Sequence, residues 1–334
     1  MDEEAVERTF MPAARAALAA FPIDAGDLEL VSLAENVTFK VVDRRDGRAY
    51  VLRLHRPGYH TLDELISERS WIRALAGAGI EVPGAMPARD GRDYVPVAIP
   101  ATGEQRLAGM LRWTEGRLLS DVLAETTDQG VVANYFAQLG ALTAAMHNQA
   151  SAWQAPSGFR RHALDSDGLM GDAPHWGPFW EHQSLSPGER ALLLDVRGRM
   201  HERLTRLSRD PSVYSLIHAD MHPGNILVDG DRLTVIDFDD AGFGWHQYDI
   251  AVVLTYWQTR PNAIEIERAF LDGYRAARRL PDDAPTAIAM FRLIRWMASI
   301  GWFHQRPELK RPAVFEERKA WVLEQCAALQ RGSS

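Results

Sequence analysis

One segment, residues 217–240, constrains the fold most, because two short apolar runs in it enclose a tight turn. The runs are Ile226-Leu227-Val228 and Leu233-Thr234-Val235-Ile236, and Asp229-Gly230-Asp231 separates them. Apolar runs of this length on either side of an Asp-Gly turn predict a β-hairpin. Polar residues stand before and after this predicted hairpin: His218, Asp220 and Asn225 before it, and Asp237 after it.

The same polar residues predict phosphoryl transfer. The spacing H-x-D-x-x-x-x-N, from His218 to Asn225, followed by a strand that ends at Asp237, is the arrangement that kinase-type chemistry needs. We expect the carboxylate of Asp220 to accept or orient the proton of an attacking hydroxyl group. Asn225 and Asp237 would hold Mg²⁺ through oxygen atoms, with phosphate and water supplying the remaining ligands. The sequence thus assigns Asp220 as the catalytic residue and Asn225 and Asp237 as the metal ligands.

Together with His222 and Pro223-Gly224, these residues resemble the catalytic and metal-binding segments of the aminoglycoside phosphotransferase and choline kinase family. A histidine two residues after the aspartate fits this group better than the protein kinases, whose loop usually carries lysine there. Within the family, the chain is most similar to the type II homoserine kinase and stress-response kinase A groups. The resemblance implies an α+β, bilobal, protein-kinase-like fold, with a small antiparallel-sheet N-terminal lobe and a mainly helical C-terminal lobe.

The resemblance also implies where the lobes divide and which residues bind the nucleotide. The apolar stretch 107–113 resembles the hinge of the family, so we expect one lobe at residues 1–112 and the other at residues 113–334. Backbone groups near Leu111 and Trp113 would bind adenine. In the family, a basic residue on the third strand neutralises the α- and β-phosphates, and a glutamate in the next helix pairs with it. These positions are taken by Arg53 and Glu68, with Glu64, one helical turn earlier, as the alternative partner.

The turn that would cover the nucleotide, Ala34-Glu35-Asn36, departs from the glycine-rich loop of kinases because it contains no glycine. Asn36 would contact phosphate through its side chain and nearby amide groups; the alternative is that asparagine simply tolerates a tight turn. Strands are predicted on both sides of this turn and further along the chain, at residues 28–33, 37–42, 49–54, 80–83 and 94–97.

Helices are predicted wherever apolar residues recur with a period near 3.6. They cover residues 3–20, 61–76, 131–149, 187–207, 250–258, 263–278, 284–303 and 312–330. Asp249 opens one of them and resembles a buried aspartate that holds the catalytic loop of the family by hydrogen bonds. Residues 150–188 show no period, and we interpret them as an insertion that packs near the acceptor site.

Composition limits the possible partners and compartment. The chain has 334 residues and a net charge of −8 with no basic stripe, which favours two lobes and disfavours a nucleic-acid partner. The N-terminus lacks the pattern of a signal peptide, and no apolar run is long enough to span a membrane. The single cysteine, Cys326, excludes an internal disulfide. We expect a cytoplasmic protein without a membrane partner.

Taken together, the sequence predicts a phosphotransferase that uses ATP and Mg²⁺ to phosphorylate a hydroxyl group of a small molecule such as an amino alcohol, a sugar or an aminoglycoside. A protein serine/threonine kinase of the stress-response type is the alternative. Few residues separate Asp240 from Asp249, which leaves little room for an activation segment. A nucleotide-binding pseudokinase is a further alternative, motivated by the glycine-free turn and opposed by the intact pair of acidic residues.

Overall fold

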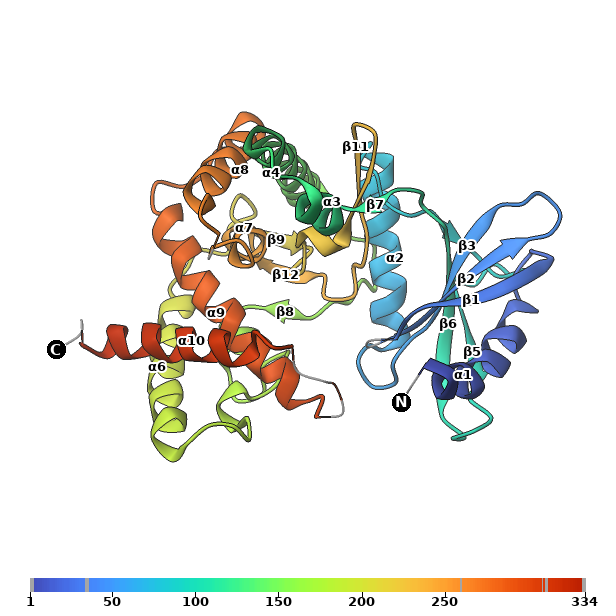
Figure 1. Ribbon diagram of the computed structural model, residues 1–334, viewed down its shortest axis with the longest axis horizontal. Coiled ribbons are helices and arrows are strands. Elements are labelled where there is room, and N and C mark those ends of the chain that lie inside the picture. Colours follow the sequence, from blue (N-terminus) through green and yellow to red (C-terminus); the bar gives the residue numbers. More distant parts are fainter. Residues whose placement is uncertain (1–2, 34–35, 259, 308, 310–311, 332–334) are drawn as a thin grey trace. The chain divides into compact units, whose positions relative to one another are not determined.

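The computed structural model describes residues 3–33, 36–258, 260–307, 309 and 312–331, and they group into two compact units (Figure 1). The first unit contains Met1–Leu119, Gln154–Arg160 and Ile226–Ile236. The second contains Ser120–Trp153, Arg161–Asn225 and Asp237–Ser334. Each unit is therefore built from several separate stretches of sequence.

An antiparallel sheet dominates the first unit. Its strands follow the order β1-β2-β3-β6-β4, and β5 also pairs with β6. The predicted strands at 28–33, 37–42, 49–54 and 94–97 are confirmed, whereas the strand predicted at 80–83 is wrong, because β4 lies a few residues later. The bounds are β1 Ala25–Leu33, β2 Val37–Asp43, β3 Ala49–Leu54, β4 Ala85–Met86, β5 Tyr94–Ala98 and β6 Gln105–Arg112.

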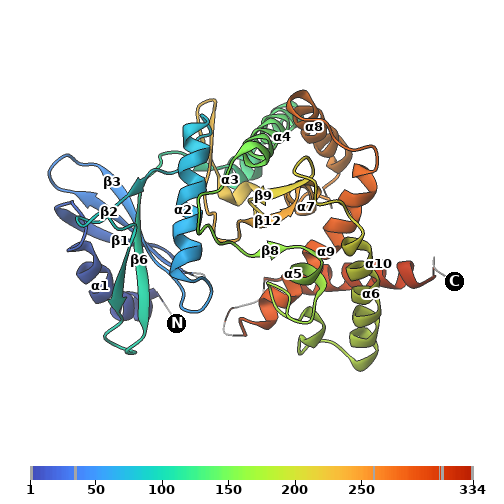
Figure 2. The same cartoon turned by 180° about the vertical axis from the view of Figure 1, so that it is seen from behind.

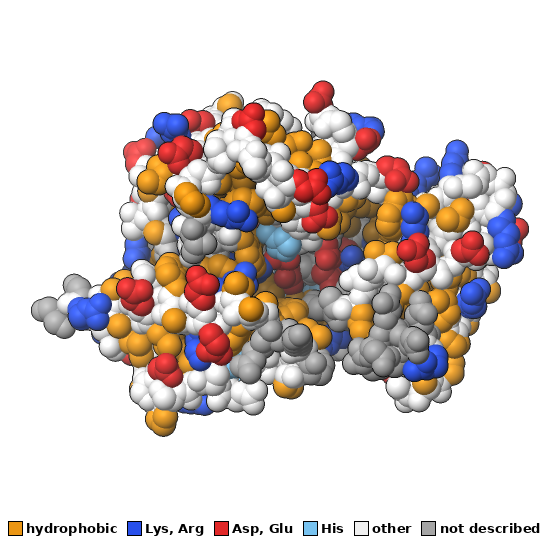
Figure 3. Space-filling model, in the orientation of Figure 1, with side chains coloured by type: hydrophobic (Ala, Val, Ile, Leu, Met, Phe, Trp, Pro, Cys, Tyr) orange, Lys and Arg blue, Asp and Glu red, His pale blue; other side chains and the backbone are white. Residues whose placement is uncertain are grey.

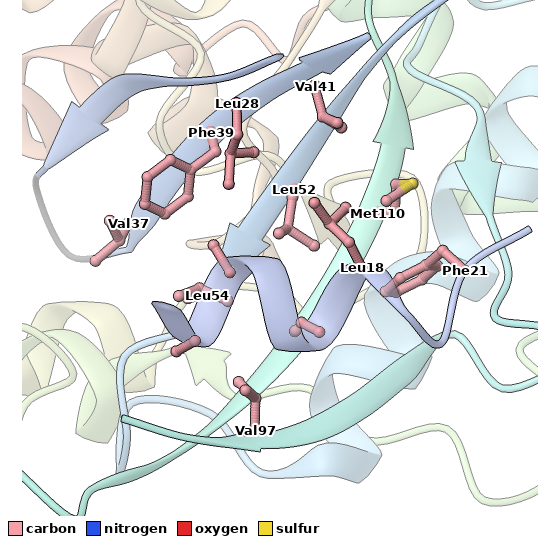
Figure 4. Close-up of a cluster of buried hydrophobic side chains, with 14 of the residues drawn as sticks. Leu18, Phe21, Leu28, Val37, Phe39, Val41, Leu52, Leu54, Val97 and Met110 are labelled. Atoms are coloured by element: carbon pink, nitrogen blue, oxygen red, sulfur yellow. The ribbon is translucent and has the colours of Figure 1, made fainter. Parts of the chain in front are cut away.

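One face of this sheet is covered by helix α1 (Glu3–Leu18). Figure 4 shows apolar side chains of the helix and of the following turn, such as Leu18 and Phe21, gathered with Leu52 and Met110 of the sheet. Because side chains alternate between the faces of a strand, the residues between the buried ones point to the opposite face. Arg53 of β3 is one of these half-buried residues on the face opposite to α1.

Helix α2 (Leu62–Gly77) follows β3 and begins at a capping box. The hydroxyl oxygen of Thr61 accepts a hydrogen bond from the Glu64 backbone N–H, and the Glu64 carboxylate accepts one from the Thr61 backbone N–H at 2.8 Å. Such reciprocal bonds satisfy two N–H groups that the first helical turn leaves without partners. The carboxylate of Glu64 thus caps the start of the helix, while Glu68 lies one turn further on and is buried.

The hairpin predicted from sequence is confirmed as β10 (Ile226–Asp229) and β11 (Arg232–Val235), with Ile226 paired to Val235 and Asp229 paired to Arg232. At the turn, Gly230 has φ +60°, in the left-handed region that glycine enters without steric cost. The outer edge of β10 pairs with β7 (Arg117–Leu118) in the same unit.

Helices form most of the second unit, and the predicted helices there are confirmed. At its centre, every residue of α7 is buried, as expected for a helix surrounded by protein on all sides. The bounds are α3 Leu119–Glu125, α4 Gln129–Ala152, α5 Ser166–Met170, α6 Pro187–Thr205, α7 His246–Thr255, α8 Ala263–Ala277, α9 Ala284–His304 and α10 Phe315–Arg331, with short 3₁₀ helices at Phe179–Glu181 and Pro223–Asn225.

Helices α4 and α8 lie side by side in both views (Figures 1 and 2) and approach each other through two glycines. A Cβ atom on Gly140 would lie 2.0 Å from the carbonyl oxygen of Phe270, and one on Gly273 would lie 1.9 Å from that of Ala137. Neither position has room for a side chain, so these glycines allow the two backbones to come together.

A small sheet within the second unit carries the strand that leads into the predicted catalytic loop. Strand β12 (Gly242–Trp245) pairs antiparallel with β9 (Tyr214–Ile217) and parallel with β8 (Ala163–Leu164). The stretch 150–188, which has no sequence period, thus contributes a strand to this sheet. The second unit is mainly helical and the first holds the large antiparallel sheet, so the predicted α+β class is confirmed.

On the face shown in Figure 3, basic and acidic side chains are interspersed over the described residues, and they form no basic stripe there. Within the part of the chain that the structure describes, no helix combines the length and the apolar character needed to cross a membrane.

Candidate active site

The loop after β9 is held by a carboxylate from the buried helix α7. Asp249 accepts hydrogen bonds from the backbone N–H groups of His218, at 3.1 Å to Oδ2, and of Ala219, at 2.7 Å to Oδ1. Ala219 has φ +65°, a left-handed conformation that is uncommon for a residue with a Cβ atom. The two hydrogen bonds stabilise this turn and fix where the next residue, Asp220, leaves the loop. The predicted role of Asp249 is confirmed.

Asp249 is itself held by His147 of helix α4. The distance from His147 Nε2 to Asp249 Oδ2 is 3.1 Å, and His147 Nδ1 lies 2.8 Å from the Tyr274 hydroxyl oxygen. Burial lowers the pKa of His147 more than its hydrogen bond to Asp249 raises it, so the ring is neutral. A neutral ring has one N–H, which donates to the carboxylate, and Nδ1 then accepts from the Tyr274 hydroxyl group.

Asp220 lies among donors and positive charges. One side-chain N–H of Asn225 donates to Asp220 Oδ2 at 3.0 Å, and His222 Nε2 lies 3.5 Å from the same oxygen. Arg295 of helix α9 forms an ion pair with Asp220 Oδ1. Burial raises the pKa of Asp220, but the charges of His222 and Arg295 outweigh it and hold that pKa well below its usual range. Asp220 is therefore ionised at neutral pH.

The two predicted metal ligands flank the open end of the β10–β11 hairpin, because its register pairs Ile226, next to Asn225, with Val235, two residues before Asp237. Asp237 has φ +62°, a left-handed conformation that aspartate tolerates better than most residues. The amide nitrogen of Asn225 is bound to Asp220, which leaves its amide oxygen to act as a ligand. A carboxylate and an amide oxygen are donors that suit Mg²⁺, so these residues fit the predicted ion.

The backbone just after Asp237 is held by two residues of the predicted insertion. The guanidinium of Arg161 donates to the carbonyl oxygens of Phe238, at 3.3 Å, and of Asp239. His162 Nε2 lies 3.1 Å from the carbonyl oxygen of Asp240. The start of the irregular stretch therefore fixes the segment that follows the predicted metal ligand.

In the first unit, the predicted phosphate-binding residue Arg53 lies on β3, paired with Thr38 of β2 and Gly109 of β6. Its predicted partner, Glu68, is 4% exposed on α2. Burial raises the pKa of Tyr94, and the charges that act on its hydroxyl group include those of both Arg53 and Glu68. Both predicted residues therefore lie near the same tyrosine.

The other predicted nucleotide-binding residues also lie in the first unit. The side-chain oxygen of Asn36 accepts a 2.9 Å hydrogen bond from the backbone N–H of Arg56, which ties the end of the predicted turn to the segment after β3. The other two residues of that turn, 34 and 35, lie outside the described residues. Leu111 is on β6. The backbone N–H of Trp113 donates a 3.0 Å hydrogen bond to the carbonyl oxygen of Ala49.

Sequence reasoning did not identify Arg295 as a residue of the site. Its guanidinium contacts Asp220 and also donates to the Tyr256 hydroxyl oxygen at 3.1 Å. A signal for it was present, because Arg295 interrupts an otherwise apolar stretch of α9 and is only 9% exposed. A buried arginine requires an acidic partner, but the sequence did not indicate which one.

The model of the phosphotransferase enzyme family matches residues 28–291 of this chain. An amicoumacin kinase of Bacillus subtilis is 25% identical over 297 residues, which cover 86% of this chain and 82% of that protein. A microcompartment-associated aminopropanol kinase of known structure is 30% identical, with a TM-score of 0.79, and the match covers 96% of this chain and 97% of the other.

The fold also matches an amicoumacin kinase that was solved with AMP-PNP and Ca²⁺, with a TM-score of 0.76, 23% identity, and coverage of 98% of this chain and 93% of the other. The predicted kinase-like fold and the predicted class of enzyme, a phosphotransferase with an alcohol group as acceptor, are thereby confirmed. The chain belongs to the phosphotransferase enzyme family.

Proposed function

We propose that the protein transfers the γ-phosphoryl group of ATP to a hydroxyl group of a small molecule, and that it depends on Mg²⁺. The observation that carries this proposal is the surroundings of Asp220, where Asn225 and Arg295 hold an ionised carboxylate in a fixed position. Phosphoryl transfer needs little covalent help from the protein, so positioning and charge neutralisation supply most of the catalysis.

Asp220 orients the acceptor in this proposal. A carboxylate offers about four lone pairs, and the side chains of Asn225, His222 and Arg295 occupy up to three of them, which leaves one for the acceptor hydroxyl group. As the acceptor oxygen bonds to the γ-phosphorus, the bond from that phosphorus to the β,γ-bridging oxygen breaks and ADP leaves. The hydroxyl proton passes to Asp220. Because the pKa of Asp220 is low, this carboxylate acts first by orientation and accepts the proton late in the step.

The metal would be held by side-chain oxygens of Asn225 and Asp237, two residues that flank the same end of the hairpin in the chain. When bound, Mg²⁺ neutralises charge on the phosphates. AMP-PNP and Ca²⁺ in the amicoumacin kinase of the same fold support a nucleotide and a divalent cation in this chain too. In the first unit, Arg53 would neutralise the α- and β-phosphates with Glu68 as its partner, while Asn36 and the backbone near Leu111 and Trp113 would contact the nucleotide.

The small molecule is favoured over a protein as acceptor by the relatives. Those relatives phosphorylate amicoumacin and aminopropanol, as their names state. The segment from Asp240 to Asp249 supports the same choice, because β12 and the first turn of α7 fill it and leave no extended activation segment.

The test is release of ADP from ATP and Mg²⁺ in the presence of amino alcohols, sugars and aminoglycosides, with a generic protein substrate in parallel. We expect ADP release that depends on a small acceptor and a phosphorylated product detected by mass spectrometry. Phosphorylation of the protein substrate alone would overturn the proposal. ATP binding without turnover for any acceptor would instead favour the pseudokinase.

A further inference from the structure

Two arginines lie against one tyrosine beside the candidate catalytic residue. The Cζ atoms of Arg295, on α9, and of Arg318, on α10, lie 5.9 Å and 5.4 Å from the ring centroid of Tyr256. Arg318 also lies over the ring of Trp296, at 4.5 Å, and the rings of Tyr256 and Trp296 pack edge to face at 5.1 Å. We call Arg295 and Arg318 the arginine pair.

The two members of the arginine pair differ in their ion pairing with carboxylates. Asp220 pairs with Arg295, and Asp240 acts on the same guanidinium from further away. In the described part of the chain, no carboxylate forms an ion pair with Arg318. Glu317 acts on it, but adjacent residues of a helix do not face each other. Burial and the charge of Arg295 both act to lower the pKa of Arg318.

Two donors near the arginine pair are not used by hydrogen bonds to the described residues. Nε of Arg295 is buried and finds no acceptor among the described residues. The Tyr256 hydroxyl oxygen accepts from Arg295, so its own hydrogen remains to be donated. A half-buried cation without an ion pair costs free energy, and a bound anion that pairs with Arg318 and accepts from the Tyr256 hydroxyl group would lower that cost.

We propose that the arginine pair and Tyr256 bind an anionic group of the acceptor, a carboxylate or a phosphate, while the acceptor hydroxyl group lies at Asp220. This inference rests on the proposed function, and it adds that the acceptor is a hydroxy acid or a phosphorylated alcohol instead of a simple amino alcohol or neutral sugar. Arginine suits this role because its planar fork matches the two oxygens of a carboxylate or phosphate.

Matched acceptors test the proposal directly. L-Homoserine and 3-aminopropanol differ only by a carboxylate, and glycerol 3-phosphate and glycerol differ only by a phosphate. We expect kcat/KM to be about tenfold to hundredfold higher for the anionic member of at least one pair, the effect of one or two charge-assisted hydrogen bonds. The pair that shows the difference identifies the anion. Equal kcat/KM within both pairs, or a preference for the neutral members, would overturn the inference.

The variant Arg318→Gln separates recognition from structure. It should raise KM for the anionic acceptor about tenfold or more, with little change for the neutral one, because a charge-assisted contact is lost. The matched control is Arg331→Gln, on the same helix and exposed to solvent, which should change neither value. An equal loss of kcat/KM for both members of a pair in Arg318→Gln would mean a structural role and would contradict the anion site.

A measurement of ligand binding tests the anion site separately from the proposed function. If no compound is phosphorylated, the proposed function fails for these acceptors, while the anion site is still decided by thermal unfolding with each compound. L-Homoserine or glycerol 3-phosphate should raise the unfolding temperature of the wild type but not of Arg318→Gln, because a ligand that binds the folded state stabilises it. No shift by either anionic compound, with no turnover, would overturn the anion site as well.

Discussion

The backbone N–H of Ala219 donates a 2.7 Å hydrogen bond to Oδ1 of Asp249, a residue 30 positions later in the chain. This bond links the buried helix α7 to the left-handed turn that precedes Asp220. The position of the candidate catalytic carboxylate is therefore set by a residue that does not itself carry out the chemistry.

Replacement of that residue, Asp249→Asn, should lower both stability and turnover. The amide keeps the size of the side chain but turns one acceptor into a donor that faces a backbone N–H, and it removes the charge that His147 contacts. We expect a loss of about 2–4 kcal/mol in the free energy of unfolding and at least a tenfold loss in kcat. Urea denaturation and steady-state kinetics measure both. The control Asp282→Asn changes an exposed residue and should alter neither, and a fully active Asp249→Asn protein would contradict the positioning role.

Asp220→Asn should abolish turnover and leave ATP binding intact. The amide no longer accepts the acceptor proton, and we expect kcat to fall by about a hundredfold to ten-thousandfold. Calorimetry with a non-hydrolysable ATP analogue should give the same affinity for the variant and the wild type. A variant that keeps its turnover would refute the catalytic assignment.

Nucleotide binding should depend on Mg²⁺ through Asp237 and Asn225. A chelator should abolish activity, and added Mg²⁺ should restore it. Asp237→Asn replaces a charged ligand with a neutral one, so the Mg²⁺ concentration for half-maximal activity should rise by roughly tenfold or more. Equal calorimetric ATP affinity with and without Mg²⁺ would be inconsistent with this site. Asp231→Asn, in the exposed turn of the same hairpin, is the matched control.

Stability should fall as the pH drops below about 6.5, the usual pKa of histidine in an unfolded chain. The rings of His147 and His246 stack at 4.3 Å, and burial lowers the pKa of both, with the neighbouring Arg278 acting in the same direction. Folding therefore requires both rings to be neutral. Below pH 6.5 the unfolded chain binds protons that the folded protein excludes, so stability is lost by up to about 1.4 kcal/mol per pH unit for each ring.

Urea denaturation between about pH 7.5 and pH 5, on either side of the ordinary pKa of histidine, measures this loss. The variant His246→Gln can keep a hydrogen bond to Ser215, because its side-chain amide reaches the position of Nε2, while it removes one titrating group, and it should have a shallower pH dependence. A pH dependence as steep as that of the wild type would show that His246 does not contribute. The carboxylate of Asp249 does not confuse this window, because its pKa is lowered and it stays ionised there.

Gly140→Ala should destabilise the protein, although alanine normally stabilises a helix relative to glycine by about 1 kcal/mol. The added Cβ would collide with the backbone of α8, so we expect a net loss of about 1–3 kcal/mol. The matched control is Gly198→Ala in α6, where a Cβ meets no atom within 4 Å and the helical preference should give a gain. Chemical denaturation measures both variants, and a stabilised Gly140→Ala protein would contradict the close approach of α4 and α8.

The sequence was sufficient to predict most helices and strands and one local group of polar residues. Apolar period and turn residues are properties of neighbouring residues, so the helices, the β10–β11 hairpin and the polar residues around it were predictable. One strand was predicted at residues 80–83, but the structure has β4 at Ala85–Met86 instead. The carbonyl oxygen of Glu81 instead accepts a hydrogen bond from the Val235 backbone N–H at 3.0 Å, a partner far away in sequence.

Only the tertiary structure decided which distant side chains share the site. Arg295 meets Asp220 across 75 positions, and His147 meets Asp249 across 102. A buried charge must find an opposite charge or a hydrogen bond, but several acidic residues satisfy that need equally well in the sequence. Packing of α4, α7 and α9 around one core selects among them, and packing is a property of the folded chain as a whole.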